Sequence, residues 1–343
     1  MRIPGLRPPS PAGLSQAAPA LLVLICTITW GAVAFAQNDD VHLAPRQKSP
    51  TPVAASEDDR NLFTHVRPLR VDVDLVLVPV SINDAMNHPV MGLQKHNFEL
   101  YEGTERQQIQ YFSTEDAPVS IGVILDISKS MSNKIDVARE AVSEFFGASN
   151  PEDDYFVITF SDKPRMLADV TRSIGYIQEK LATAEPNGHT ALLDAIYLGM
   201  TKLRSAQYKR RALLIISDGG DNCSRYRAKE IRSIVQEGDV EIYAIGLFDS
   251  IFRTPEEWAG KRLLTDITEA TGGRTVTLGN ARKLPEVARE ISRELRSRYV
   301  LGYRPTNVAH DGTWRKIRVR LTPAVNTSQM QVYSKKGYQA PSR

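Results

Sequence analysis

From Val119 to Ser297 the sequence alternates near-continuous apolar runs with amphipathic helical patterns, and this alternation restricts the fold more than any other feature. Near-continuous apolar strands are typical of a parallel sheet that is covered by helices on both faces. The sequence therefore predicts an α/β domain with a doubly wound, mostly parallel sheet over residues 118–298. In such folds a ligand lies at the carboxyl ends of the strands.

The expected elements follow each other in a regular order. The expected strands are SIGVILD, DYFVITFS, RALLIISD, VEIYAIGLF and RTVTL. The expected helices are KIDVAREAVSEFF, SIGYIQEKLA, ALLDAIYLGMTKL, AKEIRSIVQE, AGKRLLTDITEAT and LPEVAREISRELRS. In the first helix the apolar residues recur at helical spacing and predict one buried face, formed by Ile135, Ala138, Val142 and Phe145.

The segments on both sides of this domain are strand-like. Within residues 67–117, RVDVDLVLVPVSI alternates apolar with polar residues, and NFELYEG and QQIQYFS form two more short strands. Within residues 299–343, the strand-like segments are RYVLGYRP, WRKIRVRLT and QVYSKKGY. Because a few short strands bury too little surface alone, we expect both flanks to pair into one small antiparallel β-sandwich, into which the α/β domain is inserted.

The N-terminus has the pattern of an export signal. Arg2 and Arg7 precede an apolar stretch that has no charged residue from Gln16 to Asn38, and the stretch includes the small-x-small sequence Ala34-Phe35-Ala36. This pattern predicts a signal peptide over residues 1–36 that is removed on export. We therefore expect a secreted, periplasmic or cell-envelope protein.

The next segment, residues 37–66, is polar and Pro-rich and is expected to be a disordered linker. An uncleaved signal is the alternative, because the apolar run is nearly long enough to span a bilayer, and only then would the protein be membrane-bound. Lipid attachment at Cys26 is less well supported, since the bulky Ile25 precedes it.

Charge and cysteine content exclude two further classes. The net charge of +3 is spread over interleaved basic and acidic residues, which argues against a nucleic-acid-binding protein. Of the two cysteines, Cys26 lies in the expected signal and only Cys223 remains afterwards. An intrachain disulfide is then impossible, and we interpret Cys223 as an inert residue rather than a reactive thiol or a dimer crosslink.

Oxygen-bearing side chains gather where the expected strands end. Asp126 ends one strand and is followed by Ser128 and Ser130; Thr190 precedes a helix, and Asp218 ends another strand. All five are hard oxygen donors, which suit Mg²⁺ or Mn²⁺ better than zinc. Since only two of them are carboxylates, the coordination shell leaves room for a carboxylate from a partner.

The sequence DISKS, with the downstream Thr190 and SDG, resembles the metal-ion-dependent adhesion site of von Willebrand factor A domains. The resemblance implies that Ser128, Ser130 and Thr190 contact the metal, and that Asp126 and Asp218 bind it directly or through water. The flanks PVMGLQKHNFELYEGTERQQIQYF and YVLGYRPTNVAHDGTWRKIRV are similar to those of an exported bacterial family common among acidobacteria. The resemblance covers roughly residues 70–338, and His189 replaces the glycine more common before the Thr.

Several of these residues also fit simpler roles. Ser130 or Thr190 alone would be interpreted as a helix cap, and Asp221 and Asn222 as turn formers rather than additional metal ligands. A phosphatase with an aspartyl nucleophile needs a second carboxylate two positions on, where this chain has Ser128.

The sequence thus predicts an exported, non-enzymatic, adhesion-type binding protein whose partner is a protein or extracellular-matrix ligand with an acidic residue. The alternative is a structural or assembly subunit of a cell-envelope complex with a vestigial metal site, and a metal-dependent hydrolase comes third.

Overall fold

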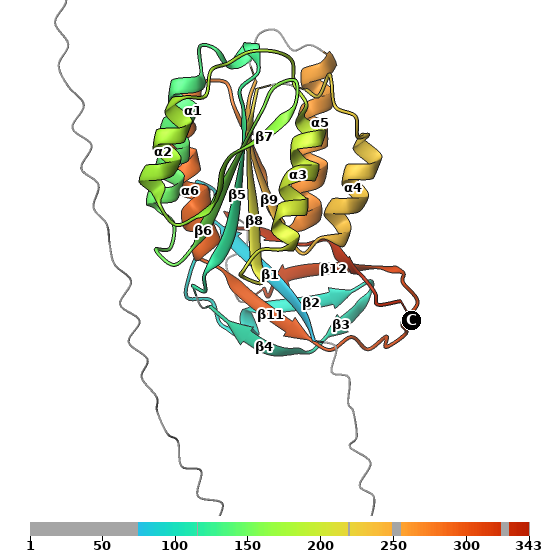
Figure 1. Cartoon of the computed structure of the whole chain (residues 1–343). Coiled ribbons are helices and arrows are strands. Elements are labelled where there is room, and N and C mark those ends of the chain that lie inside the picture. The colour runs from blue at the N-terminus through green and yellow to red at the C-terminus, as the bar shows by residue number, and fades with distance from the viewer. Residues whose placement is uncertain (1–74, 115, 219, 249–254, 324–328, 343) are drawn as a thin grey trace, which may run out of the picture. The chain divides into compact units, whose positions relative to one another are not determined.

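The computed structural model describes residues 75–114, 116–218, 220–248, 255–323 and 329–342 (Figure 1). The chain separates into two units, residues 1–69 and 70–343, and all described residues belong to the second. The expected signal peptide and linker therefore lie outside the described residues. Within the described part, no helix is long and apolar enough to cross a membrane.

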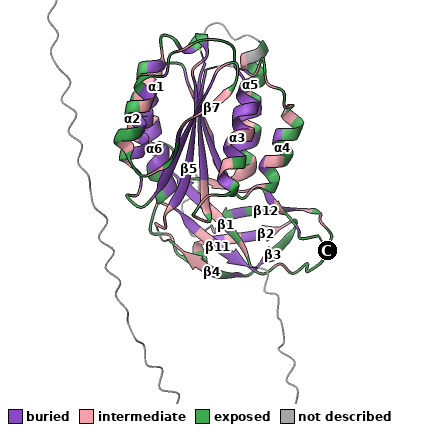
Figure 2. Ribbon diagram, in the orientation of Figure 1, coloured by how far each residue is buried: buried purple, intermediate pink, exposed green. Residues whose placement is uncertain are grey.

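A six-stranded sheet with strand order β10-β9-β8-β5-β6-β7 forms the centre of the α/β domain. Five strands are parallel: β5 (Val119–Asp126), β6 (Asp154–Phe160), β8 (Arg210–Ser217), β9 (Glu241–Leu247) and β10 (Thr275–Leu278). Every residue of β5, β6 and β9 is buried (Figure 2). The strand order reverses at β5, because the chain adds β6 on one side of it and later β8 on the other. The predicted doubly wound sheet is confirmed.

Helices cover both faces of this sheet. α1 (Ile135–Gly147), α2 (Ile174–Ala182) and α6 (Leu284–Arg296) pack on one face, and α3 (Leu192–Arg204), α4 (Ala228–Glu237) and α5 (Pro255–Thr271) lie on the other (Figure 1). The expected face of α1 is buried throughout, as predicted: Ile135, Ala138, Val142 and Phe145. Short 3-10 turns lie at Lys95–Asn97, Lys129–Met131 and Ala281–Lys283.

The strand β7 (Pro164–Thr171) is missing from the sequence-based prediction. It pairs antiparallel with β6 at the edge of the sheet, with register shifts along the pair. Only Ala168 of this strand is buried, so the segment carries no apolar pattern that would reveal a strand. The helix expected after β6 is present as α2, but β7 lies between the two elements.

The flanking segments form two four-stranded antiparallel sheets, as predicted. One has the order β13-β1-β11-β4 and the other β14-β12-β2-β3. Their strands are β1 (Val76–Asn83), β2 (Phe98–Glu102), β3 (Glu105–Gln107), β4 (Ile109–Ser113), β11 (Tyr299–Tyr303), β12 (Trp314–Leu321), β13 (Gln331–Ser334) and β14 (Gly337–Gln339). Each sheet contains strands from both ends of the chain. The two sheets share one core, in which the rings of Phe98 and Tyr299 lie 5.0 Å apart.

Two expected strands of the sandwich are each divided in the structure. QQIQYFS contributes to β3 and β4, and QVYSKKGY gives β13 and β14. In both cases the two pieces belong to opposite sheets. The chain crosses from one sheet to the other within one or two residues, a change that a period-two pattern does not reveal.

A buried polar network joins the sandwich to the α/β domain. The carboxylate of Glu294 on α6 accepts hydrogen bonds at 2.9 Å each from Asn83 Nδ2 on β1, Arg274 Nε and the hydroxyl of Tyr243 on β9. Burial raises the pKa of Tyr243 well above its ordinary value, and the negative charge of Glu294 raises it further. The Glu294 side chain is 1% exposed, so its charge is stabilised by these partners and not by water.

Replacing Glu294 by Ala should therefore destabilise the protein by about 3–5 kcal/mol, because Arg274 would be left as an uncompensated buried charge. Glu286→Ala is the matched control, since Glu286 is an exposed carboxylate on the same helix. It should change the free energy of unfolding by less than about 1 kcal/mol. Urea unfolding measures both, and equal small effects would contradict a stabilising role for the network.

Candidate metal site

Asp126 lies at the carboxyl end of β5, beside the point where the strand order reverses. Its Oδ1 accepts a hydrogen bond from the Ser128 amide at 2.8 Å, and its Oδ2 accepts one from Ser217 Oγ at 2.6 Å. The residue is fully buried. Burial, together with the nearby charge of Asp218, raises its pKa to about 6, although the hydrogen bonds from Ser128 and Ser217 oppose the shift. At neutral pH the group is thus mainly a buried carboxylate, which a nearby positive charge would stabilise.

Ser128 directly precedes the 3-10 turn Lys129–Met131, and Ser130 lies within that turn. Ser128 Oγ lies 3.1 Å from Ser130 Oγ, and Ser130 Oγ donates to Asp218 Oδ1 at 2.7 Å. Because a hydroxyl has one hydrogen and that of Ser130 points to Asp218, Ser128 is the donor between the serines. Ser128 is buried and Ser130 is exposed, so the group opens to solvent at Ser130. The structure thus brings together four of the five expected residues.

The fifth residue, Thr190, lies on the neighbouring loop. That loop is bonded to the serine loop by Lys129 N to Gly188 O (3.2 Å) and Asn187 N to Ile127 O (2.8 Å). Gly188 has φ of 73°, and a Cβ there would lie 2.7 Å from the Asp162 carboxylate, so the turn requires glycine. Thr190 is buried, but within the described residues its hydroxyl forms no hydrogen bond to the other four. It does not cap α3, whose N-cap residue is Ala191.

Asp221 and Asn222 hold this loop in place. Asn222 Oδ1 accepts from the Thr190 amide at 2.8 Å, and the Asn222 amide donates to Thr190 O at 3.0 Å. Asp221 Oδ1 accepts from the Leu193 amide at 3.2 Å, in the first turn of α3. The sequence identified both as turn residues, but their role in positioning Thr190 depends on a contact between distant loops and could not be read from it.

Lys134 is the charged residue of the site that sequence reasoning missed. Its Nζ lies 2.7 Å from Asp218 Oδ2, so both oxygens of Asp218 are bonded, one to Ser130 and one to this ammonium. The only signal was its position eight residues after Asp126 in a loop already singled out. Ser217, which bonds Asp126, was missed as the last residue of an apolar strand.

The chemistry of this group suits a hard divalent cation. Its donors are carboxylate and hydroxyl oxygens, with no nitrogen or sulfur ligand. The described residues contain no cluster of three or more His, Cys, Asp or Glu side chains that could hold a metal ion. A cation at this place would therefore depend on hydroxyl oxygens as well as on Asp126 and Asp218. Asp126, Ser128, Ser130 and Asp218 would hold it, and Thr190 on the neighbouring loop is the remaining candidate ligand.

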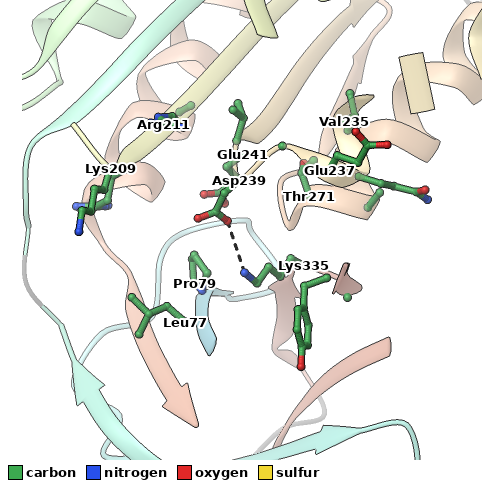
Figure 3. A pocket seen from close by; sticks show the side chains of 18 of the residues that line it. Leu77, Pro79, Lys209, Arg211, Val235, Glu237, Asp239, Glu241, Thr271 and Lys335 are labelled. Atoms are coloured by element: carbon green, nitrogen blue, oxygen red, sulfur yellow. Dashed lines mark ion pairs between the residues drawn. The ribbon is translucent and has the colours of Figure 1, made fainter. Parts of the chain in front are cut away.

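A cavity of about 370 Å³ lies at the opposite edge of the central sheet, next to the sandwich (Figure 3). Four of its charged residues form two ion pairs: Lys335 lies 3.5 Å from Asp239, and Arg298 pairs with Glu241. It is lined in addition by apolar residues such as Leu77 and Pro79. We interpret this cavity as part of the junction between the two domains.

Cys223, the remaining cysteine, is free and exposed.

Comparison with known proteins gives one family match. Residues 121–220 match the model of the von Willebrand factor type A domain, and this range contains all five site residues. An uncharacterized protein of Borreliella burgdorferi is 22% identical over 144 residues, which are 39% of this chain and 42% of that protein.

Among solved structures, a von Willebrand factor type A protein from Catenulispora acidiphila has a TM-score of 0.46 at 15% identity, over 78% of this chain and 63% of that one. The PilB minor pilin from Streptococcus sanguinis has a TM-score of 0.44 at 14% identity, over 57% and 63%. The chain thus spans less than two thirds of each of these proteins.

Proposed function

This chain contains a von Willebrand factor type A domain, and we propose that it is an exported, non-enzymatic protein that binds a partner through a divalent cation. The observation that carries the proposal is the hydrogen-bonded group of Asp126, Ser128, Ser130 and Asp218 at the carboxyl ends of β5 and β8. Mg²⁺ or Mn²⁺ would be held there, with Thr190 completing the protein ligands. When bound, the cation supplies a Lewis-acidic position for a carboxylate of the partner.

The surroundings of the site favour an acidic partner. Lys129 is exposed between the two serines. Beside them, Ile127 and Asn187 line a hollow of about 670 Å³, whose charged residues are the cations Lys163, Arg165 and Lys180 and the anions Asp162 and Glu185. Lys163 and Arg165 are exposed and form no ion pair with another described residue, whereas Asp162 is held by His189. Unpaired cations next to the site attract acidic surfaces during encounter and disfavour basic ones.

The geometry gives little support to the other two functions. A hydrolase with Asp126 as nucleophile would need a free acid or base beside it. Asp126 is bonded to the Ser128 amide and the Ser217 hydroxyl, and the nearby carboxylate of Asp218 is held by Ser130 and Lys134. A phosphatase and esterase panel tests that function. A structural subunit with a vestigial site would bind its neighbours equally well with and without a divalent cation, so the metal dependence of binding separates it from the proposal.

A panel of immobilised hexapeptides, each with one Asp or with Asn in its place, tests the proposal. In Mg²⁺ the full chain should bind the best Asp peptide about tenfold more tightly than its Asn counterpart, because a charge-assisted contact to the cation is lost. With a chelator the difference should disappear. Asp and Asn peptides that bind equally in Mg²⁺ would contradict a partner carboxylate.

Ser128→Asp is an informative variant in the same assay. The added negative charge should tighten Mg²⁺ binding and weaken binding of the Asp peptide, since it competes with the incoming carboxylate. Calorimetry gives the first affinity and the panel gives the second. If this variant bound the Asp peptide as well as the unaltered protein, the partner-carboxylate mechanism would be wrong.

A further inference from the structure

We propose that Lys134 is a resident cation of the site: it holds Asp218 while no metal is bound, weakens binding of a divalent cation alone, and makes the loaded site bind a carboxylate more tightly. The inference rests on the function proposed above and concerns how the same site is controlled. It is carried by the place of Lys134 in the fold, by its contact with Asp218 and by the charge of the group.

The place of Lys134 gives no advantage to the helix that it precedes. It is the N-cap residue of α1, but its side chain forms no capping hydrogen bond. Ser, Thr, Asp and Asn are preferred at this position, and a cation there opposes the helix dipole. The backbone nevertheless fixes the residue, because its amide donates to Met131 O at 2.8 Å and its carbonyl accepts from Ala138 N at 3.0 Å. The reason for a lysine must therefore lie at the end of its side chain.

That end lies against an expected metal ligand. The Lys134 ammonium is 2.7 Å from Asp218 Oδ2, in a place where the Asp218 side chain is 1% exposed and that of Lys134 is 20% exposed. With Ser130 bonded to Oδ1, both oxygens of Asp218 have hydrogen-bond partners. An entering cation must compete with the Lys134 ammonium for Asp218 Oδ2. Because this charge-assisted hydrogen bond lies in a poorly hydrated place, the competition lowers the affinity for the cation.

The lysine also changes the charge of the site at each stage of binding. Asp126, Asp218 and Lys134 carry one net negative charge, a dication converts it into one positive charge, and a partner carboxylate neutralises it. Without the lysine the loaded site would be neutral, and the carboxylate would leave it negative. The ammonium therefore lowers the affinity of the site for the metal and raises the affinity of the loaded site for the partner carboxylate. By linkage, the carboxylate must in turn tighten metal binding.

The test uses the full chain, Mn²⁺ as the metal and acetate as the carboxylate. Lys134→Met removes the charge from a side chain of similar length, and Lys134→Arg keeps it; Lys134→Gln is a second neutral variant. We expect the neutral variants to bind Mn²⁺ about tenfold more tightly and, once loaded, to bind acetate about fivefold more weakly. Calorimetry gives the first affinity, and the water-proton relaxation of bound Mn²⁺ gives the second. Lys134→Arg should stay close to the unaltered protein.

Lys209→Met is the matched control, because it removes an exposed ammonium just before β8, at the other end of that strand from Asp218, and Lys209 has no ion pair within the described residues. It should change Mn²⁺ affinity less than about twofold, since exposed charges are strongly screened. Unchanged Mn²⁺ and acetate affinities in both neutral variants would overturn the role of Lys134 and leave the proposed function standing. If neither the unaltered protein nor any variant bound Mn²⁺, both would be overturned.

Discussion

Removal of residues 299–343 should unfold the N-terminal strands as well as delete the C-terminal ones. β1 pairs with β11 on one side and β13 on the other, and β2 pairs with β12. The deletion also takes large buried side chains from the shared core, namely Tyr299, Leu301, Tyr303, Ile317 and Val319. At about 1.5–3 kcal/mol for each buried apolar side chain, this loss is comparable with the whole stability of an ordinary domain.

Hydrogen exchange of the β1 amides, Val76–Asn83, measures this effect. We expect their protection to fall to that of an unfolded segment, while β5 and β8 retain most of theirs. A chain that ends at Ala340 is the control, because the described residues beyond it are exposed. Unchanged protection in β1 after the long deletion would contradict a single sandwich built from both flanks.

Asp126→Asn should remove most of the stabilisation by a divalent cation while leaving the protein folded. The amide has the shape of the carboxyl group and can still accept from the Ser128 amide, and removal of a buried charge does not itself cost stability. A metal present at 100 times its Kd should stabilise the unaltered protein by about 2.7 kcal/mol. In the variant we expect metal affinity to fall about 100-fold or more, so this increment should fall to about 0.4 kcal/mol or less.

Urea unfolding in Mg²⁺ and in chelator measures the increment for each protein. Asp136→Asn is the matched control, since it removes a carboxylate from the first turn of α1 that is 89% exposed. This variant should keep the full increment. An Asp126→Asn protein that Mg²⁺ stabilised as much as the unaltered chain would exclude Asp126 as a ligand.

The pattern of apolar residues was sufficient to predict the α/β domain and the pairing of the two flanks. The central strands are buried on both faces, so their sequences are unmistakably apolar. It was insufficient at the edges: β7 has a single buried residue, and the pieces of QQIQYFS and QVYSKKGY change sheets within one or two residues. At such places pairing is decided by neighbouring strands and not by the local sequence.

The candidate site divides in the same way. Asp126, Ser128, Ser130 and Asp218 could be placed together because strand ends of a parallel sheet share one edge. Lys134 and Asn222 could not, since one depends on where α1 begins and the other on a bond between loops. Metal binding, the effect of Lys134 on it and the partner remain predictions from the chemistry of these residues.

The most direct test of the account is anomalous diffraction from crystals of the protein grown in Mn²⁺. We expect one strong anomalous peak within bonding distance of oxygens from Ser128 and Ser130, on the side where Asp126 and Asp218 converge, and no such peak in Asp126→Asn crystals. Crystals of the unaltered protein that contain Mn²⁺ and show no peak there would contradict the proposed metal site.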